Sequence, residues 1–238
     1  TSVDHDLFSI ASDTGVLTFA SAPDFETPGC GAGNDANVCV VVIKVSDGLA
    51  GSADDTITVT ATVQDLNDET PSFTSSASPS IAENVQNVVV LAASDADDSD
   101  TVTFAITGGA DETKFEIDGG TQLRFKTANI PDYESTTAAG GAQEYVVEVT
   151  ASDTAGSPNT ATQTITVTIT DANEAAPVFG DGDSASATPN ENQQAVGTYA
   201  ATDADGTASL TYSIVNSGDD PTSVDHDLFS IASDTGVL

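Results

Sequence analysis

The sequence predicts an all-β protein made of tandem seven-stranded Greek-key β-sandwich modules, one complete and two partial. Three observations support this prediction: the chain repeats itself, its apolar segments alternate with period two, and Val, Ile and Thr are prominent among its residues. Residues of that kind favour strands, and a hydrophobic content of 38% is too high for a disordered acidic chain.

Two repeat lengths define the predicted modules. The segment TSVDHDLFSIASDTGVL of residues 1–17 recurs unchanged as residues 222–238, an offset of 221 residues. Inside that period, DLNDETPSF of residues 65–73 is matched by DANEAAPVF of residues 171–179, and Pro71 and Pro177 are 106 residues apart. We therefore expect residues 1–70 to be the C-terminal part of a module A. Residues 71–176 are then a complete module B, and residues 177–238 the N-terminal part of the next module A.

Module B shows its strands as alternating or short apolar runs. In TVTFAIT, for example, Val102, Phe104 and Ile106 face one side and the threonines face the other. The expected strands are residues 88–91, 101–107, 114–118, 122–127, 144–150 and 160–170. No segment has a helical period, and about seven strands in a module of this size predict two packed sheets.

The charge balance restricts the function. With 38 Asp and Glu against 4 Lys and Arg, the formal net charge is −34, which argues against nucleic acid as a partner. The sequence contains no run of about 18 apolar residues, so we do not expect a membrane span in it. The chain has no initiator Met and no signal peptide, and we expect it to be part of a longer or processed protein.

The two cysteines, Cys30 and Cys39, lie on either side of a turn rich in Gly, Asn and Asp. We expect a disulfide across a hairpin, with a reduced buried pair as the alternative. For so short a loop the chain-entropy gain is about 2–3 kcal/mol. Because no second pair of cysteines and no nearby histidine accompanies them, Cys30 and Cys39 make a poor zinc site. A disulfide implies an oxidising compartment.

The carboxylates concentrate at strand ends and linkers rather than on strand faces. A solvated acidic surface or ordinary turns are the alternatives to a site. In module B the side chains are Glu83, Asp95, Asp97, Asp132, Glu134, Asp153, Asp171 and Asn173. In module A they are Asp24, Glu26, Asp47, Asp65, Asn67, Asp68, Glu191, Asp203 and Asp205.

These motifs resemble those of cadherin repeats over the whole chain. The resemblance includes FSIASDTGVL followed by DFE in residues 8–26, and FEIDGGTQLRF followed by DYE in residues 115–134. It implies that carboxylates of successive modules meet at each junction and bind about three Ca²⁺ ions there, which suits a set of hard oxygen ligands.

The resemblance also implies a ligand set for each junction. The first would use Asp24, Glu26, Asp65, Asn67, Asp68, Asp95, Asp97 and Asp153. The second would use Glu83, Asp132, Glu134, Asp171, Asn173, Asp203 and Asp205. Asp47 and Glu191 occupy ligand positions of junctions that this chain does not complete. The linkers depart from the family pattern at Glu69, Glu174 and Ala175, and the alanine offers no side-chain oxygen, so we expect fewer ions at residues 171–177.

The favoured function is a calcium-rigidified structural or adhesive repeat of an extracellular stalk, adhesin or filament. Its partners would be neighbouring copies of the repeat, either covalent or head-to-tail. Completion by a neighbouring chain would supply the segment Asp6–Leu17 twice, which argues against it. The low Lys and Arg content suggests a prokaryotic cell-surface protein.

Two other functions are weighed against this one. A carbohydrate-binding module, with cell-surface or matrix glycans as partners, needs exposed aromatic residues. The candidates Tyr133, Tyr145, Tyr199 and Tyr212 fall mostly in ligand motifs or alternating strands. An enzyme is not expected, because one histidine position, His5 with its copy His226, and two paired cysteines leave no nucleophilic constellation.

Overall fold

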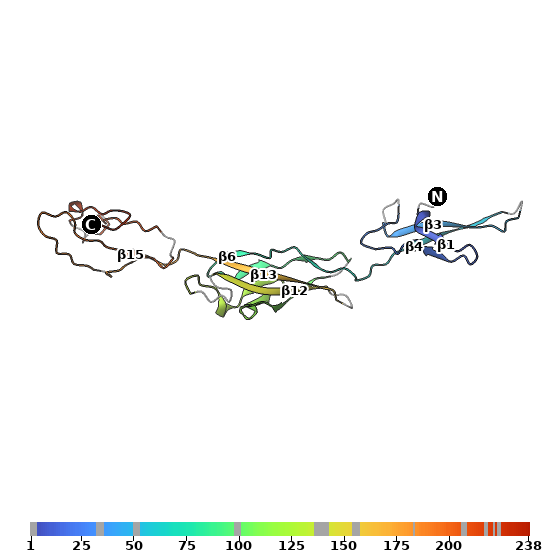
Figure 1. The fold of residues 1–238 in the computed structure, drawn as a ribbon, viewed down its shortest axis with the longest axis horizontal. Helices are drawn as coiled ribbons and strands as arrows, with labels where there is room; N and C mark the ends of the chain where they lie inside the picture. The colour runs from blue at the N-terminus through green and yellow to red at the C-terminus, as the bar shows by residue number, and fades with distance from the viewer. Residues whose placement is uncertain are drawn as a thin grey trace.

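The chain forms three units in a row along an elongated molecule, with the two termini at opposite ends (Figure 1). The computed structural model describes residues 4–31, 36–49, 53–97, 101–135, 143–153, 158–182, 184–205, 209–216, 219–220, 222 and 225–238. Most of the turn between the two cysteines, residues 32–35, lies outside these ranges, as do the ends of the repeated segment at residues 1–3 and 223–224.

The middle unit is a sandwich of two sheets. One sheet has four strands in the order β6-β13-β12-β9, with β6 parallel to β13 and the other pairs antiparallel. Its strands are β6 (Ser80–Ala82), β9 (Thr103–Gly108), β12 (Glu144–Ser152) and β13 (Thr160–Thr170). The other has the order β10-β11-β7 and consists of β7 (Asn87–Val90), β10 (Phe115–Asp118) and β11 (Gln122–Phe125). The short strands β5 (Ser72–Phe73) and β8 (Ala93–Ser94) pair beside them.

Period-two alternation produces the core of this unit. In β12 every second residue from Tyr145 to Ala151 is buried, and β13 buries Ile165, Val167 and Ile169 in the same way. The Phe125 ring lies between the rings of Phe115 and Tyr145, with centroid distances of 4.4 and 5.0 Å. The all-β sandwich predicted from the alternation is therefore confirmed.

The first unit contains two hairpins. Strand β1 (Phe8–Ile10) pairs with β2 (Leu17–Phe19), and β3 (Val38–Val45) pairs with β4 (Asp55–Thr62). The pairs Phe8–Phe19 and Phe115–Phe125 have the same register, so β1 and β2 correspond to β10 and β11 of the middle unit.

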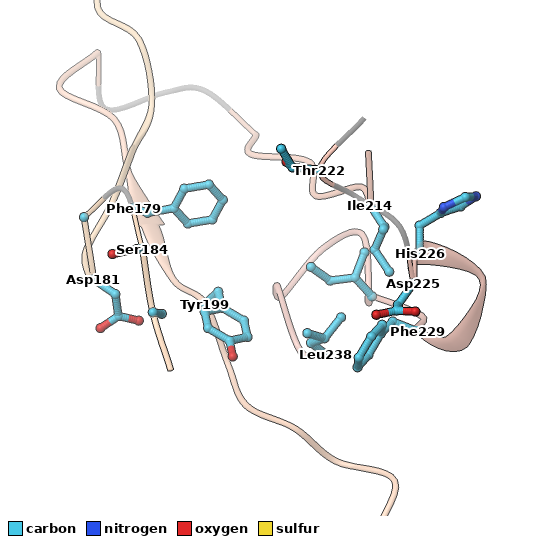
Figure 2. A pocket seen from close by; sticks show the side chains of 13 residues that line it. Phe179, Asp181, Ser184, Tyr199, Ile214, Thr222, Asp225, His226, Phe229 and Leu238 are labelled. Atoms are coloured by element: carbon cyan, nitrogen blue, oxygen red, sulfur yellow. The ribbon is translucent and has the colours of Figure 1, made fainter. Parts of the chain in front are cut away.

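The last unit has little regular structure in its described residues. Strand β14 (Val178–Phe179) pairs with β15 (Ala201–Thr202), and Thr198 bridges to Val237. An open cavity of about 490 Å³ separates the segments of this unit, with apolar and aromatic side chains on its walls (Figure 2).

The helical segments among the described residues are single 3-10 turns. They are η1 (His5–Leu7), η2 (Glu112–Lys114), η3 (Thr127–Asn129) and η4 (His226–Leu228). The turn η2 explains why the strand expected from residue 114 begins only at Phe115. No helix in the described ranges is long and apolar enough to cross a membrane.

A buried aspartate before two of these turns ties each turn to a strand of the facing sheet. Asp111 is fully buried, and its Oδ2 accepts the Val146 N–H at 2.9 Å. Asp4 does the same in the first unit, where it accepts the N–H groups of Val40 at 2.7 Å and Gly31 at 2.9 Å. These two hydrogen bonds lower the pKa of Asp4, because they stabilise its charged form.

The expected disulfide between Cys30 and Cys39 is present. Cys39 is fully buried in β3, whereas Cys30 lies in no strand. The bond therefore joins β3 to the loop that precedes it. The sequence had led us to expect a disulfide between two strands of a hairpin.

Candidate metal sites at the module junctions

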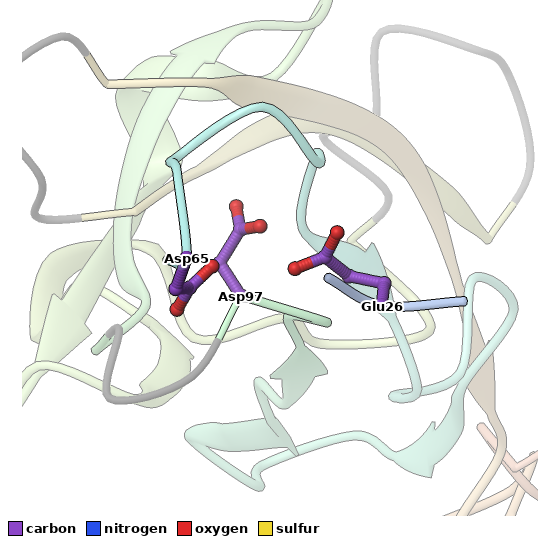
Figure 3. Close-up of side chains that lie close together, drawn as sticks. All are labelled: Glu26, Asp65 and Asp97. Atoms are coloured by element: carbon purple, nitrogen blue, oxygen red, sulfur yellow. The ribbon is translucent and has the colours of Figure 1, made fainter. Parts of the chain in front are cut away.

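Three carboxylates from three separate segments meet where the first unit joins the middle unit. Glu26 lies in the loop after β2, Asp65 follows β4, and Asp97 follows β8. One ligand oxygen of each lies within 4.8 Å of the other two. Figure 3 shows the three side chains facing a common space. An arrangement of this kind can place several hard oxygen ligands around one cation.

Hydrogen bonds across the junction fix the linker on the middle unit. The Glu69 N–H donates to Asp97 Oδ2 at 3.1 Å, and the Asp97 N–H donates to Asp95 Oδ1 at 3.1 Å. Asn159 donates its side-chain amide to the carbonyl of Asn67 at 3.2 Å, and its backbone N–H to Asp153 Oδ2 at 2.9 Å. Each of these acidic side chains thus uses one oxygen to shape the backbone.

The other oxygens of these three aspartates, and one oxygen each of Glu26 and Asp65, are buried without a hydrogen-bond partner. They are Glu26 Oε1, Asp65 Oδ1, Asp95 Oδ2, Asp97 Oδ1 and Asp153 Oδ1. Asp97 and Asp153 are only 5% and 3% exposed. A buried carboxylate oxygen is costly unless a hydrogen-bond donor or a cation satisfies it, so this donor set fits a hard divalent cation.

Burial, together with neighbouring like charges, raises the pKa values of two carboxylates in this cluster. Burial raises the pKa of Glu26, and the neighbouring Asp24, Asp65 and Asp68 raise it further. Burial likewise raises the pKa of Asp97, together with the charges of Asp95, Asp65 and Asp68. In the absence of a cation, the ionised forms of these two groups are therefore disfavoured.

The second junction contains two related clusters. Glu83, Asp132 and Glu134 form one, and Glu134, Asp171 and Asp205 form the other, each with ligand oxygens within 4.8 Å. Glu134, Asp171 and Asp205 take the places that Glu26, Asp65 and Asp97 have at the first junction. The structure thus brings eight of the seventeen predicted ligands into three-carboxylate clusters among the described residues.

Backbone amides occupy more of the carboxylate oxygens at the second junction. Glu83 accepts the Tyr133 N–H at 2.6 Å and the Ala172 N–H at 2.9 Å. Asp205 Oδ2 accepts the N–H groups of Glu174 and Ala175, both at 2.8 Å. The Glu174 carboxylate accepts a hydrogen bond from the Asn84 side chain, which turns it toward the middle unit.

The remaining predicted ligands lie beside these clusters or away from them. Asp24 Oδ1 accepts the N–H groups of Glu26 and Thr27, both at 3.2 Å, and Asp203 Oδ1 accepts that of Asp205 at 3.0 Å. Asp47 and Glu191 are exposed and belong to none of the clusters found among the described residues. Asp47 instead accepts the Leu49 N–H at 2.9 Å in a turn.

Two asparagines that shape the junctions, Asn84 and Asn159, were not singled out from the sequence. Asn84 directly follows the predicted ligand Glu83, and Asn159 reaches a carbonyl 92 residues away. The buried Asp4 and Asp111 were also missed. The pattern D-x-x-x-F, which recurs as DHDLF and DETKF, is the signal that could have identified them.

The fold and these sites define a class: tandem β-sandwich units with acidic clusters where units meet. Within it, residues 78–170 match the cadherin domain family. Protocadherin Fat 1 of Homo sapiens is 29% identical over an alignment of 185 residues that covers 75% of this chain and 4% of that protein. Cadherin-87A of Drosophila melanogaster is 30% identical over 259 residues, covering 98% of this chain and 12% of that protein. The chain thus spans only a small part of the relatives it matches.

Solved structures share the fold. The human desmocollin-1 ectodomain superposes with a TM-score of 0.65 at 21% identity, covering 98% of this chain and 43% of that one. Mouse cadherin-23 EC22-24 gives a TM-score of 0.58 at 21% identity and covers 98% and 70%. These matches support the resemblance to cadherin repeats. Cadherin domains are extracellular, non-enzymatic adhesion modules, in agreement with the prediction that the chain is not an enzyme. The relatives named here are animal proteins and give no support to a prokaryotic origin.

Proposed function

We propose that this chain is a calcium-stiffened segment of an extracellular structural or adhesive array, with Ca²⁺ bound at its module junctions. The observation that carries the proposal is the set of five buried carboxylate oxygens without hydrogen-bond partners at the first junction. In this assignment residues 1–70, 71–176 and 177–238 are successive pieces of alternating modules, and about three ions bind at the first junction.

The ligands proposed for the first junction are those implied by the family resemblance. Glu26, Asp65 and Asp97 face one another directly, while Asp95 and Asp153 each present a second oxygen. Bound calcium would neutralise the repulsion among these groups. The chain itself contributes the backbone hydrogen bonds from Glu69 and Asn159, which orient the carboxylates before any ion arrives.

The second junction is proposed to bind fewer ions. Ala175 supplies no side-chain oxygen, and one carboxylate oxygen of Glu174 already accepts a hydrogen bond from the Asn84 side chain. Alternate joints of the array would then differ in stiffness.

The carbohydrate-binding alternative gains no support from the two tyrosines of the middle unit. Tyr145 is 2% exposed in the core, and Tyr133 packs against the same core. The proposed location is extracellular, while a prokaryotic source rests on composition alone.

Small-angle X-ray scattering with calcium and with a chelator tests the proposal. Calcium is expected to give the profile of a semi-rigid rod, and chelation to shift it toward a flexible chain, because the junction carboxylates then repel one another. Profiles that coincide under the two conditions would contradict calcium stiffening.

A pair of substitutions assigns any effect to the first junction. Asp97→Asn removes one charge from the cluster and is expected to weaken calcium binding there by at least about tenfold, measured by titration calorimetry. Asp13→Asn makes the same charge change at an exposed position outside the clusters and serves as the control. Equal affinities for the two variants would place the site elsewhere.

A further inference from the structure

The linker between the first and middle units lies against the loop that leads into β13. The side-chain amide of Asn159 donates to the carbonyl of Asn67 at 3.2 Å, although the two residues are 92 positions apart in the sequence. Two residues further along the linker, the Glu69 N–H donates to Asp97 Oδ2 at 3.1 Å. The linker is therefore held on the middle unit at two points, and only the second of them uses a carboxylate of the metal cluster.

Backbone hydrogen bonds fix Asn159 in place beside a proposed ligand. Its N–H donates to Asp153 Oδ2 at 2.9 Å, and the Asp153 N–H donates to the Asn159 carbonyl at 3.3 Å. Asp153 is 3% exposed, and its Oδ1 is the oxygen left for a cation. The Asn159 side chain thus reaches the linker from a base that is already tied to the cluster.

The hydrogen bond between Asn159 and Asn67 differs in kind from the carboxylate contacts of the junction. Asp65 of the linker and Asp97 of the middle unit have ligand oxygens within 4.8 Å of each other, and their like charges repel when no cation lies between them. An amide–carbonyl hydrogen bond carries no net charge, so it attracts the linker whether or not a cation is present. It therefore favours the docked linker in the calcium-free protein.

We propose that Asn159 is a positioning residue for the first junction, whose side chain holds the linker docked on the middle unit before calcium binds. The inference rests on the proposed function, because it assigns a role toward the same calcium site. An ion that binds only the docked linker has an apparent dissociation constant equal to its intrinsic value divided by the docked fraction. By raising that fraction, Asn159 strengthens calcium binding without contacting the ion.

The side chain at this position differs between the two kinds of module. Strands β4 and β13 have matching registers, in which Val59 takes the place of Ile165. At the same offset in the sequence, Ala53 of module A takes the place of Asn159. Alanine has no side-chain donor, so this contact with the linker is a property of module B. In the proposed array, the joints that precede the two kinds of module therefore differ in how far the linker is docked without calcium.

Substitution by alanine removes the Asn159 side chain and leaves the hydrogen bonds of its backbone in place. One neutral hydrogen bond corresponds to about a fivefold change in an equilibrium constant. In Asn159→Ala we expect the protection of the Glu69 amide from hydrogen exchange, measured by NMR in chelator, to fall by up to about fivefold. Titration calorimetry is expected to give a calcium dissociation constant for the first junction that is higher by about two- to fivefold, because the docked fraction is smaller.

Two further variants serve as controls. Asn87→Ala makes the same truncation at an exposed position of β7 and should leave both quantities at their wild-type values. Asn159→Asp keeps the size of the side chain but puts an oxygen in place of the donor that faces the Asn67 carbonyl. It should lower the protection of the Glu69 amide in chelator at least as much as alanine does. Hydrogen exchange of the β12 amides reports whether each variant keeps the fold of the middle unit.

Lower protection of the Glu69 amide together with weaker calcium binding in Asn159→Ala supports the proposal. A change in only one of the two quantities, or in neither, overturns it, and so does wild-type protection in Asn159→Asp. A wild-type chain that binds no calcium at the first junction would refute the proposed function, and this inference with it. A wild-type chain that binds calcium, beside an unchanged Asn159→Ala variant, would refute the role of Asn159 alone.

Discussion

Replacing the buried Asp111 with alanine tests how strongly a turn is tied to the facing sheet. Asp111 is fully buried, accepts the Val146 N–H at 2.9 Å, and lies 3.1 Å from Lys114 Nζ. Asp111→Ala removes both contacts. It leaves the N–H of the half-buried Val146, in strand β12, with no side-chain acceptor.

The expected cost follows from these contacts. A buried N–H that loses its acceptor costs about 1–3 kcal/mol, and loss of a charge-assisted hydrogen bond is at the upper end of that range. Including the lost partner of Lys114, we expect the free energy of unfolding of the middle unit to fall by about 3 kcal/mol. This is a large share of the roughly 5–15 kcal/mol that stabilises a domain. Asp111→Asn keeps an acceptor oxygen and should cost about half as much.

Hydrogen exchange of β12 amides, read by mass spectrometry, measures this change locally, and urea unfolding measures it for the unit. Asp118→Ala is the matched control, because Asp118 is exposed and only pairs with Arg124 at 2.9 Å, an arrangement worth at most about 1 kcal/mol. If the Asp111 and Asp118 variants cost the same, the buried aspartate does not anchor the turn.

Three further predictions concern the junctions and the disulfide. Ala175→Asn should raise calcium affinity at the second junction about tenfold by adding a ligand oxygen, and titration calorimetry showing no gain would contradict the ligand assignment. The raised pKa values of Glu26 and Asp97 mean that the calcium-free folded junction binds more protons than the unfolded chain. The stability of the calcium-free junction should therefore rise as pH falls from 7 toward 5, whereas its calcium affinity should fall over the same range. Melting curves in chelator measure the first trend and calcium titrations measure the second. Trends of the same sign would contradict the prediction. Reduction of Cys30–Cys39 should destabilise the first unit by about 2–3 kcal/mol, seen as faster amide exchange in β3, with the middle unit unchanged as the internal control.

The long strands of the middle unit were predictable because they are long enough for a period of two to repeat. The expected strands at residues 144–150 and 160–170 became Glu144–Ser152 and Thr160–Thr170. The short strands β5, β6 and β8 were not predicted, since two or three residues cannot show a period. Strand β6 is defined only by its parallel pairing with β13, a contact between distant parts of the sequence.

The sequence predicted which carboxylates belong to the clusters, but not which hydrogen bonds their oxygens make. The motif spacing and the family resemblance assigned Glu26, Asp65 and Asp97 to the same junction from the sequence alone. Their role as calcium ligands remains a proposal. The sequence did not reveal which oxygen of each group backbone amides already occupy, because that depends on how the linker lies against the next unit. The hydrogen bond from the Asn84 side chain to Glu174 likewise joins the linker to the middle unit and could not be predicted.

The parallel pairing of β6 with β13 determines how a module responds to tension. The chain enters the middle unit through β5 and β6 and leaves it after β13, so a pull along the array draws β6 and β13 in opposite directions. Because they are parallel, with Ser80, Ile81 and Ala82 opposite Thr168, Ile169 and Thr170, their hydrogen bonds are loaded together in shear and cannot open one at a time. This short ladder therefore resists tension next to Asp171, where the following junction begins.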